Sequence, residues 1–277
     1  MKSDKVYQLA LFGDPVSHSL SPKIHHNFAQ QFDLNIDYQL FKVSTDEFHH
    51  AVINFFSSGG HGANVTLPHK QQALNISNNI SKVAQQALAV NTLFLNDTSE
   101  IYADNTDGIG FINDLNNRCH LNCKDKKILM LGAGGATQGI VPEIILQSPN
   151  MLVIANRSIE KAKQIAQYGN SQAVRLSELE KIEDKFDLII HASSLGHQGQ
   201  TLKFFQHQTK TNTICYDLSY GEAANAFIEY SQSMLINQTY DGLGMLIEQA
   251  ACSFEVWFGL KPDTQSLTKS LIVKSYK

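Results

Sequence analysis

Three polar segments in the N-terminal part of the chain carry residue types that can bind an oxygen-rich ligand and move a proton. They are Ser17–Pro22, Asn64–Lys70 and Asp104–Gly108. Serine hydroxyls beside the free amides of a helix start form a good carboxylate site. A lysine just past a strand end, such as Lys70, can hold a hydroxyl or transfer a proton if its environment lowers its pKa. An aspartate beside it, such as Asp107, can polarise a hydroxyl that loses its proton as hydride leaves the carbon.

Each of these segments also has an ordinary structural interpretation. Ser21 ahead of Pro22 suits the capped start of a helix. A lysine such as Lys70 is usually a solvated surface charge, because lysine is rarely buried. Aspartate and asparagine in the segment Asp104–Gly108 favour a turn and a helix cap. Taken one at a time, the three segments leave both interpretations open.

A glycine-rich segment in the middle of the chain is typical of a dinucleotide site. The apolar run Ile128–Leu131 ends in a turn with Gly132, Gly134 and Gly135, a helical segment follows, and a second apolar run covers Met151–Ala155. Strand, turn, helix and parallel strand follow one another in the order that such a site needs. The first glycine allows the tight turn, the second lets the backbone approach a pyrophosphate, and the amides of the new helix face its oxygens.

The residues after the second run favour NADP over NAD. An NAD site usually has Asp or Glu there to hold the ribose 2′-hydroxyl, whereas this chain has Asn156 and Arg157, with Lys161 one turn later. An arginine holds a 2′-phosphate that a carboxylate would repel. The match is imperfect, because Thr137 occupies the third fingerprint position. A glycine-rich turn also occurs in sheets that bind another phosphate ligand or none, and that alternative stays open.

Composition restricts the classes of protein to consider. The chain has 277 residues, 43% hydrophobic and 17% charged, which favours two domains of ordinary size with full cores. Its net charge of -4 argues against a nucleic-acid surface and an anionic membrane surface. The apolar run Leu9–Phe12 is too short for a secretory signal, and no segment approaches the roughly 18 apolar residues that span a bilayer. We therefore expect a cytoplasmic protein without membrane or nucleic-acid partners.

Cysteine and histidine residues give no metal-site pattern. Only Cys119 and Cys123 are close among the four cysteines, and no histidine cluster accompanies them. Adjacent histidines such as His25 and His26 point to different faces of a helix. We expect reduced thiols and no metal.

Strands and helices must bring the polar segments together. Bounded apolar runs predict strands, and apolar residues three or four apart predict helices. We expect strands at residues 6–12, 38–43, 63–66, 91–96, 100–103, 128–131, 151–155, 173–176, 188–191 and 213–217. We expect helices at residues 45–56, 71–76, 82–88, 108–115, 243–258 and 264–274, one after Gly135, and one that starts at Ser21 with the serine as its cap.

This order of elements predicts an α/β fold with two domains. Residues 1–107 and 243–277 are expected to form an α/β substrate-binding domain, since the C-terminal helices return to the first domain. Residues 108–242 are expected to form a Rossmann-like nucleotide-binding domain. Small ligands usually bind in a cleft between domains, and we expect the active site there.

Taken together and in order, these motifs resemble those of the shikimate dehydrogenase family over nearly the whole chain. The motifs that carry the resemblance are Phe12–Pro15, His18–His25, Gly62–Lys70, Ala89–Thr92, Asp104–Gly110, Leu131–Ala136, Asn156–Ser158, Asp241–Leu246 and Gln249–Ala251. The resemblance implies reversible, NADPH-dependent reduction of 3-dehydroshikimate to shikimate, a step towards chorismate and the aromatic amino acids. It implies a small-molecule substrate and NADP as cofactor, and a homodimer is one assembly that fits the sequence.

The resemblance also implies roles for individual residues. Lys70 matches the catalytic lysine and Asp107 its partner. The residues implied to bind the substrate are Ser19, Ser21, Thr66, Asn91, Asp107, Tyr220 and Gln249. The residues implied to bind NADP are Gly132, Ala133, Gly134, Gly135, Ala136, Asn156, Arg157, Ser158, Lys161, Leu218 and Gly242. Shikimate has one carboxylate and three hydroxyls, so a serine pocket at one end and amide, lysine and carboxylate groups at the other suit it.

Three positions depart from the family pattern. His191 stands where asparagine is common, in a loop expected beside the nicotinamide. The segment Tyr220–Phe227 lacks a common Thr-Pro pair, so we expect a changed start of its helix with Tyr220 intact. Lys161 replaces a common arginine, and we expect a less rigid grip on the 2′-phosphate.

Three rival functions stay open on the sequence. A quinate/shikimate dehydrogenase that accepts NAD would favour an acidic residue where Asn156 and Arg157 stand. A non-catalytic sensor of shikimate-like ligands would not need Lys70 or Asp107. Another two-domain dehydrogenase, such as one acting on a folate, would not need the serine pocket.

Overall fold

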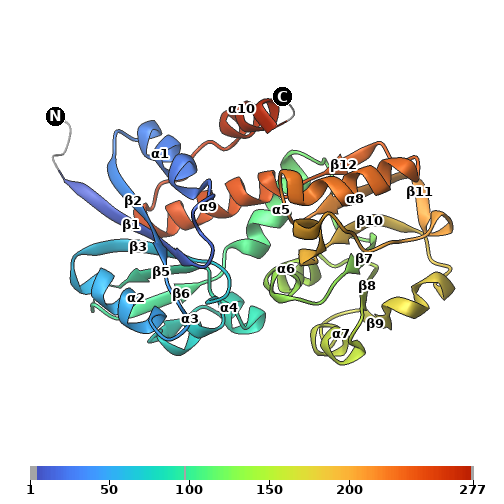
Figure 1. The fold of residues 1–277 in the computed structure, drawn as a ribbon, viewed down its shortest axis with the longest axis horizontal. Helices are drawn as coiled ribbons and strands as arrows, with labels where there is room; N and C mark the ends of the chain where they lie inside the picture. The colour runs from blue at the N-terminus through green and yellow to red at the C-terminus, as the bar shows by residue number, and fades with distance from the viewer. Residues whose placement is uncertain (1–4, 97, 276–277) are drawn as a thin grey trace. The chain divides into compact units, whose positions relative to one another are not determined.

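The computed structural model describes residues 5–96 and 98–275, which form two compact units (Figure 1). One unit comprises the chain up to Gly110 together with the chain from Ile247 onward, and the other comprises Phe111–Leu246. The chain passes between the units within two helices, α5 (Asp107–Asn117) and α9 (Leu243–Phe258). The expected domain boundaries, after residues 107 and 242, fall near the starts of these helices. Residues 1–4 and 276–277 of the first expected domain lie outside the described residues.

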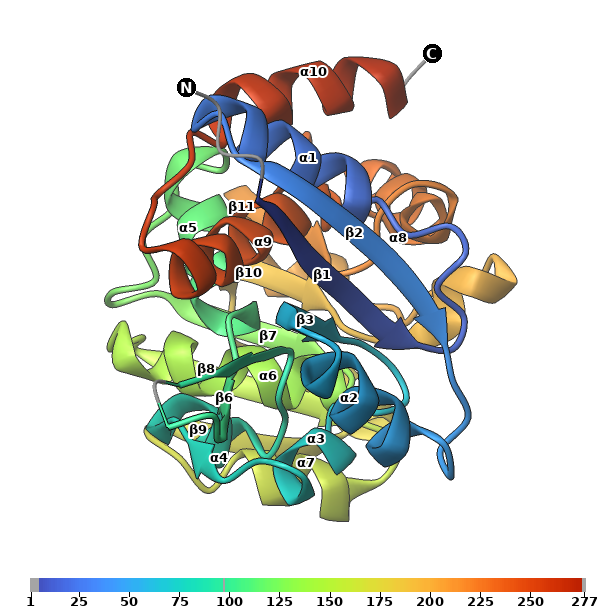
Figure 2. The same ribbon diagram turned by 90° about the vertical axis from the view of Figure 1, so that its left-hand side faces the viewer.

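The first unit is built on a mixed sheet with strand order β2-β1-β3-β5-β6-β4 (Figure 2). Strands β2, β1 and β3 are parallel, whereas β5 is antiparallel to both β3 and β6. The strands are β1 (Val6–Gly13), β2 (Asn35–Lys42), β3 (Gly60–Val65), β4 (Asn79–Ile80), β5 (Thr92–Leu95) and β6 (Ile101–Asp104). The remaining helices are α1 (Ser21–Gln31), α2 (Phe48–Ser57), α3 (Gln72–Asn75), α4 (Lys82–Ala87) and α10 (Gln265–Ser275).

Alternation along β1, which lies between β2 and β3, divides the core of this unit into two layers. Ala10 and Phe12 of β1 pack with Phe48 and Val52 of α2. On the other side, Phe28 of α1 makes an edge-on contact with Phe254 of α9. Helices therefore cover both faces, and the loops at the strand ends are left to carry polar side chains.

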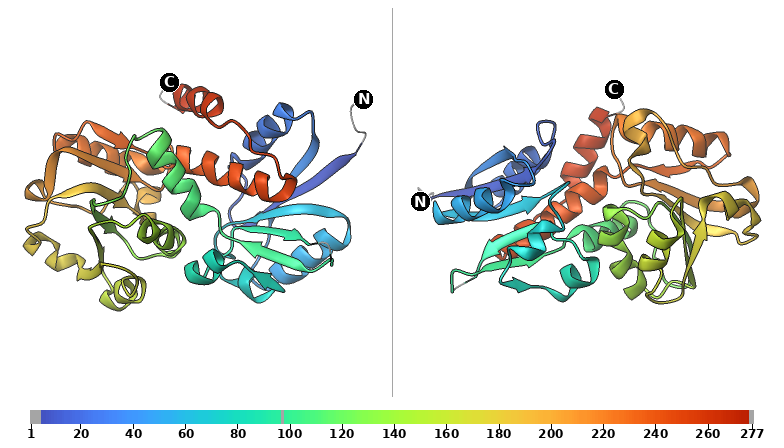
Figure 3. Two further views of the ribbon diagram at one scale, coloured as in Figure 1. Left: turned by 180° about the vertical axis from the view of Figure 1, so that it is seen from behind. Right: turned by 60° about the horizontal axis from the view of Figure 1, so that its bottom comes forward.

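The second unit is a parallel sheet with strand order β12-β11-β10-β7-β8-β9 (Figure 3). Its strands are β7 (Lys127–Leu131), β8 (Met151–Asn156), β9 (Ser171–Arg175), β10 (Phe186–His191), β11 (Thr209–Asp217) and β12 (Gln238–Tyr240). Its further helices are α6 (Gly135–Leu146), α7 (Ile159–Ile165) and α8 (Glu222–Ser233), with 3-10 turns at Leu176–Lys181, Ser194–Gln198 and Gln206–Gln208.

Alternating residues of the same strands face two separate cores in this unit. Ile128 and Met130 of β7 pack with residues of α5, α6 and α7, whereas Leu129 and Leu131 pack on the side of α8. The first strand of the unit, β7, lies in the middle of the sheet. Strands β8 and β9 follow on one side of it, and β10, β11 and β12 lie on the other side. That topology is the doubly wound one of the Rossmann fold. The expected two-domain α/β architecture with a Rossmann-like unit is confirmed.

Two local expectations were wrong at helix starts. Helix α2 begins at Phe48 and not at residue 45, because the Glu47 carboxylate accepts hydrogen bonds from the backbone N–H and hydroxyl of Ser44 and so stabilises a preceding turn. Ser21 is the first residue of α1 and does not cap it, since the cap position is Leu20, whose side chain makes no cap hydrogen bond. The expected α8 begins at Glu222 after Gly221, whose φ of 62° is one that glycine adopts readily.

His25 lies in the core of the first unit as an uncharged aromatic residue. Its ring stacks on Tyr38 at a centroid distance of 4.8 Å and lies 5.1 Å from the Trp257 ring. Among the described residues, neither ring nitrogen has a hydrogen-bond partner. Burial is the main cause that lowers the pKa of His25 to about 3, and a contact with Asn64 opposes the fall only in part.

This buried histidine makes the stability of the protein depend on pH. The unfolded chain binds a proton at His25 below pH 6.5, whereas the folded chain does not until about pH 3. Stability is therefore lost as pH falls through this range, and His25→Phe abolishes the loss. The free energy of unfolding of the variant relative to wild type should rise by about 1.4 kcal/mol per pH unit below pH 6.5, in urea titrations. His26→Phe, at the exposed neighbour, is the matched control. Parallel pH profiles for wild type and His25→Phe would contradict the assignment.

Candidate functional site

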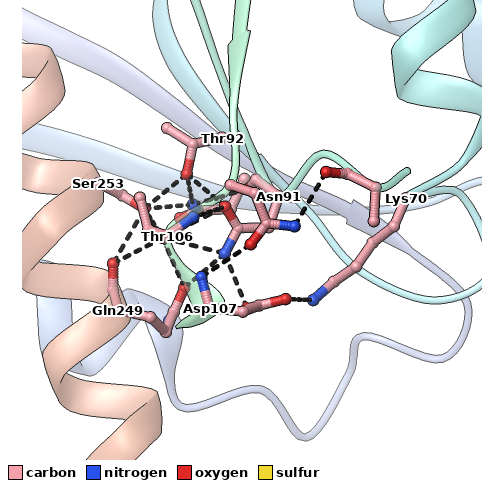
Figure 4. Close-up of polar contacts among 10 residues, drawn as sticks. Lys70, Asn91, Thr92, Thr106, Asp107, Gln249 and Ser253 are labelled. Carbon is pink, nitrogen blue, oxygen red and sulfur yellow. Dashed lines mark hydrogen bonds and ion pairs between the residues drawn. The ribbon is translucent and has the colours of Figure 1, made fainter. Parts of the chain in front are cut away.

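A lysine and an aspartate meet at one edge of the first unit (Figure 4). Lys70 lies in the segment after β3, and Asp107 is the first residue of α5. The Lys70 Nζ atom donates to Oδ2 of Asp107 at 2.5 Å. Their side chains are 21% and 8% exposed, so the ion pair is largely shielded and about a fifth of the lysine side chain stays accessible. The surface-charge interpretation of Lys70 is therefore wrong.

The segment before Lys70 is held by a buried histidine. His69 is fully buried, and its Nε2 lies 2.9 Å from the carbonyl oxygen of Val43. Its ring also stacks on Phe48. The carbonyl of Lys70 itself accepts from the Val90 amide at 2.8 Å. Both contacts restrain the backbone from which the lysine projects.

Asn91 occupies the centre of the polar cluster (Figure 4). Its Nδ2 donates to Oδ1 of Asp107 at 2.8 Å and to Oε1 of Gln249 at 3.2 Å. Its Oδ1 accepts from the backbone N–H of Thr106 at 2.9 Å. Asn91 is 2% exposed, and its amide can take only one orientation because donors and acceptors surround it. The structure thus brings together Lys70, Asn91, Asp107 and Gln249 from four segments of the chain.

Further buried polar residues hold the backbone of Asn91 in place through hydrogen bonds. Asn64 donates to the carbonyl oxygen of Asn91 and to the Ser253 hydroxyl, at 3.1 and 3.0 Å. Its own oxygen accepts from the Tyr38 hydroxyl at 2.8 Å. These supporting contacts were missed in the sequence. Ser253 lies one helical turn after Gln249 on α9, and that i, i+4 spacing is the signal that could have pointed to it.

The serine pair occupies the loop before α1. The Ser19 hydroxyl donates to the Ser21 hydroxyl at 3.1 Å and accepts from the Ser21 backbone N–H at 3.2 Å. Ser21 also contacts Tyr38, whose pKa burial raises well above its ordinary value. Since Ser21 does not cap the helix, its hydroxyl faces a polar neighbourhood that includes Tyr38. Thr66 lies at the end of β3, where its amide donates to the carbonyl of Phe12.

The glycine turn of the second unit has the backbone geometry that a phosphate ligand needs. Gly132 has a φ of 116°, and a Cβ there would lie 2.6 Å from the carbonyl oxygen of Ala192. A Cβ at Gly134 or Gly135 would meet no other described residue within 4 Å, so the start of α6 is open. Thr137, the imperfect fingerprint position, is fully buried and donates its hydroxyl to the Gly132 carbonyl at 3.1 Å. It therefore closes the turn with a hydrogen bond where a glycine would close it by packing.

The end of β8 carries the expected polar residues at the surface. Asn156 donates to the Ser158 carbonyl at 3.0 Å, and the Ser158 hydroxyl caps α7 by accepting from the Lys161 amide. Arg157 and Lys161 are exposed. Arg175 was missed: its strand register places it opposite Asn156, where it adds a cation 3.9 Å from Glu160. The sequence alone does not show that β8 and β9 pair, so it could not point to Arg175 as a neighbour of Asn156.

Leu218, Tyr220 and Gly242 belong to the second unit. The Gly242 amide donates to the Ser219 carbonyl at 2.7 Å, and a Cβ at Gly242 would lie 2.2 Å from the Leu218 carbonyl oxygen. Only glycine allows these segments to approach so closely. Tyr220 is half-buried, and burial raises the pKa of its hydroxyl.

Two further features bear on the class of protein. Over the described ranges, 5–96 and 98–275, no three His, Cys, Asp or Glu side chains are grouped as a metal site would require. Within the same ranges, no helix combines the length and apolar character that a membrane span needs.

Comparison with known families finds three matches along the chain. Residues 11–93 match the shikimate dehydrogenase substrate binding domain, residues 114–220 match shikimate / quinate 5-dehydrogenase, and residues 242–272 match the shikimate 5′-dehydrogenase C-terminal domain. The three matches follow one another in chain order and together span both units.

Individual proteins are similar to this chain over nearly its whole length. The shikimate dehydrogenase (NADP(+)) of Colwellia psychrerythraea is 40% identical over 266 residues, which cover 95% of this chain and 96% of that protein. An Ael1 enzyme from Pseudomonas putida has a similar structure, with a TM-score of 0.87, 32% identity, and coverage of 96% and 98% of the two chains. A shikimate dehydrogenase solved in complex with NADP+ has a TM-score of 0.85 and 30% identity, with coverage of 100% and 98%.

The buried polar residues that hold the backbone of Asn91 generate a prediction about stability. Asn64→Leu keeps the side-chain volume but removes the acceptor of the Tyr38 hydroxyl and one of the two donors to the Asn91 carbonyl, which keeps the Val65 amide. A buried polar group that loses its partner costs about 1–3 kcal/mol, so urea unfolding should show a loss of about that size. Gln39→Leu, on the exposed side of β2, removes hydrogen bonds of the same kind and is expected to change stability by less than about 0.5 kcal/mol. Equal effects of the two substitutions would show that these buried hydrogen bonds are not structurally important.

Proposed function

The chain belongs to the shikimate dehydrogenase family, and we propose that it catalyses the reversible, NADPH-dependent reduction of 3-dehydroshikimate to shikimate. The observation that carries the proposal is the cluster of Lys70, Asp107, Asn91 and Gln249, which joins a proton donor to a set of groups suited to hydroxyls. A homodimer and a cytoplasmic location stay predictions of the sequence alone.

Lys70 is proposed as the general acid and base. The cofactor, when bound to the second unit, would supply the hydride for the carbonyl carbon C3. The Lys70 ammonium gives its proton to the oxygen as the C=O bond becomes C–O–H, and in oxidation the amine takes that proton back. The partial exposure of Lys70 lets solvent restore the proton after each turnover.

Asp107 is proposed to orient Lys70 and to bind a neighbouring ring hydroxyl. One of its oxygens already accepts from Lys70 and the other from Asn91, so the carboxylate is held in place before the substrate arrives. Asn91 and Gln249 are proposed to hold the ring hydroxyls. Such preorganisation means that little rearrangement is needed during the reaction.

Ser19, Ser21 and Thr66 are proposed to bind the carboxylate of the substrate. Hydroxyl donors suit an anion, and the Ser19 and Ser21 hydroxyls lie beside each other at the start of α1. Tyr220 of the second unit is proposed as a further substrate contact. Its hydroxyl stays protonated at neutral pH, since burial raises its pKa, and it can therefore donate to a carboxylate.

The second unit fits NADP on three grounds. The start of α6 is open at Gly134 and Gly135 and offers amides to a pyrophosphate. The end of β8 offers exposed Arg157, with Lys161, for a 2′-phosphate. No carboxylate occupies the position of Asn156 that would favour an unphosphorylated ribose. Ala133, Ala136 and Ser158 complete the proposed phosphate contacts, and Leu218 and Gly242 are proposed to line the nicotinamide.

The initial rate of shikimate oxidation with NADP and with NAD in parallel tests this function. Rapid turnover with NADP and little with NAD is the expected result. Comparable or faster turnover with NAD would favour the quinate/shikimate enzyme instead. A folded protein that binds shikimate without turning it over would be the sensor.

Removing the proposed acid should abolish most of the rate and leave the fold intact. Lys70→Ala is expected to lower kcat by about 10²–10⁴, the usual contribution of a general acid or base. Lys42→Ala removes an exposed lysine whose side chain is 72% accessible and should leave kcat unchanged. Steady-state kinetics and circular dichroism of both variants provide the measurement. Near-wild-type turnover by Lys70→Ala would refute the assignment.

Removing the proposed 2′-phosphate ligand should weaken NADP binding selectively. A charge-assisted hydrogen bond contributes about 1.5–3 kcal/mol, so Arg157→Ala is expected to raise the Kd for NADP about 10- to 100-fold. The Kd for NAD should hardly change, because NAD lacks that phosphate. Lys163→Ala, an exposed residue of the same helix region, is the control. A similar loss for both cofactors would mean that Arg157 does not read the phosphate.

A further inference from the structure

A buried histidine and a buried aspartate face each other at the ends of two neighbouring strands of the second unit. His191 ends β10 and Asp217 ends β11, and the two are direct partners in the strand register. Their side chains are 0% and 1% exposed. His191 Nδ1 lies 2.8 Å from Oδ2 of Asp217. The catalytic scheme above uses neither residue.

The backbone around His191 determines where its ring hydrogen lies. The Leu202 backbone N–H points to Nε2 at 3.4 Å, and a backbone N–H can only donate. Nε2 must therefore be an acceptor, and the hydrogen is on Nδ1, where it is donated to Asp217. The Ser193 hydroxyl, 2.8 Å from Nε2, then has to donate as well.

These contacts form one directed chain of hydrogen bonds. The Leu195 amide donates to the Ser193 hydroxyl, Ser193 to His191, and His191 to Asp217. The second oxygen of Asp217 accepts from the Ser219 amide at 2.8 Å. The chain thus joins the loop after β10 to the loop after β11, and bonds in such a series strengthen one another. We call these four residues, Ser193, His191, Asp217 and Ser219, the relay.

The relay lies at the ligand edge of the sheet. The order of strands reverses between β7 and β10, and ligands of doubly wound sheets bind beyond the strand ends at such a reversal. Ala192, inside the relay loop, lies against Gly132 of the phosphate turn. At the other end, Ser219 accepts from the Gly242 amide, and Leu218 donates to the His191 carbonyl at 2.9 Å. Both ends of the relay therefore touch segments proposed to hold the cofactor.

The order Ser193–His191–Asp217 is also the order of a hydrolase triad, but the surroundings differ. The imidazole is completely buried and stacks on Phe227 at 4.9 Å. Its acceptor nitrogen is shared between the Ser193 hydroxyl and the Leu202 amide. The serine is thus engaged as a structural donor.

We propose that the relay is a positioning device for the nicotinamide, which fixes the loops after β10 and β11 relative to one another. The inference rests on the proposed NADP-dependent function and deepens it. His191 and Asp217 act through the backbone of the loops, so they are positioning residues. Their loss should affect the rate of hydride transfer more than the affinity for the cofactor, because a misplacement of about 1 Å costs up to about 100-fold in rate.

Asp217→Asn is the most informative variant, because it introduces hydrogen-bond donors at residue 217 while the shape of the side chain stays the same. The amide oxygen can keep the Ser219 bond, and the NH2 group then faces Nδ1 and forces the ring hydrogen onto Nε2. That hydrogen would oppose the Leu202 N–H. Ser193→Ala removes the other end of the chain without burying an unpaired charge, and it tests the proposal even if Asp217→Asn fails to fold. Asp187→Asn, at the opposite end of β10, is the matched control, since Asp187 also accepts from a backbone amide and a lysine.

Kinetics with shikimate and NADP are the first readout. Asp217→Asn and Ser193→Ala are each expected to lower kcat about tenfold while the Kd for NADPH changes by less than about threefold. The double variant should lose no more than the more affected single variant, because both break the same chain. Losses that simply multiply, or kcat values within about twofold of wild type in folded variants, would overturn the proposal.

Hydrogen exchange of the protein without cofactor is the second readout, and it does not depend on activity. Asp217→Asn should accelerate amide exchange in the peptide that contains Leu195 and Leu202, although the mutated residue is distant in sequence. Asp187→Asn should leave that peptide unchanged. Unchanged exchange in Asp217→Asn would overturn the relay. If Asp217→Asn accelerates exchange as expected but the wild-type protein does not oxidise shikimate, the relay stands and the proposed function is refuted.

Discussion

Asp107 is almost withdrawn from water, and a carboxylate in that position needs a partner on each oxygen. Lys70 supplies one and Asn91 the other, while Asn105 accepts from the Asp107 backbone amide. The lysine is then held by the carboxylate, and Asn91 is held in turn by Thr106 and by Gln249 of α9. The arrangement of four segments thus follows from the need to satisfy one shielded charge, and the same arrangement leaves the Lys70 side chain partly exposed.

Much of the architecture could be predicted from local patterns. The run Lys127–Leu131, the glycine turn and the run Met151–Asn156 have the lengths and punctuation of a nucleotide-binding unit, and they form neighbouring parallel strands. Lys70 and Asp107 could be singled out because the first follows a recognisable strand and the second begins a helix, whereas the role of Asn91 was implied by the family resemblance alone. Polar residues at strand ends are the residues for which sequence position alone says most about placement.

Partners that depend on three-dimensional packing could not be predicted. Asn64 supports Asn91 across a strand pair, and Arg175 lies beside Asn156 only because β8 and β9 pair in that register. Arg118 pairs with Asp114 one helical turn away, which the i, i+4 spacing allows, but its contacts with Asp241 depend on the packing of the second unit. His191 was noted as an unusual residue, yet its bond to Asp217 spans 26 residues and requires the adjacency of β10 and β11.

The discontinuity of the first unit has a consequence for biosynthesis. The second unit, Phe111–Leu246, is contiguous and can fold as soon as it has left the ribosome. The first unit begins at the N-terminal side but needs the stretch from Ile247 onward, including Gln249 and Ser253, to complete its core and its polar cluster. During translation, the N-terminal part of the first unit must therefore wait for α9, and until then its Asn64 and Asn91 amides lack their contacts with Ser253 and Gln249. A chaperone that shields nascent chains would meet this protein as a finished nucleotide-binding unit attached to an unfinished sheet.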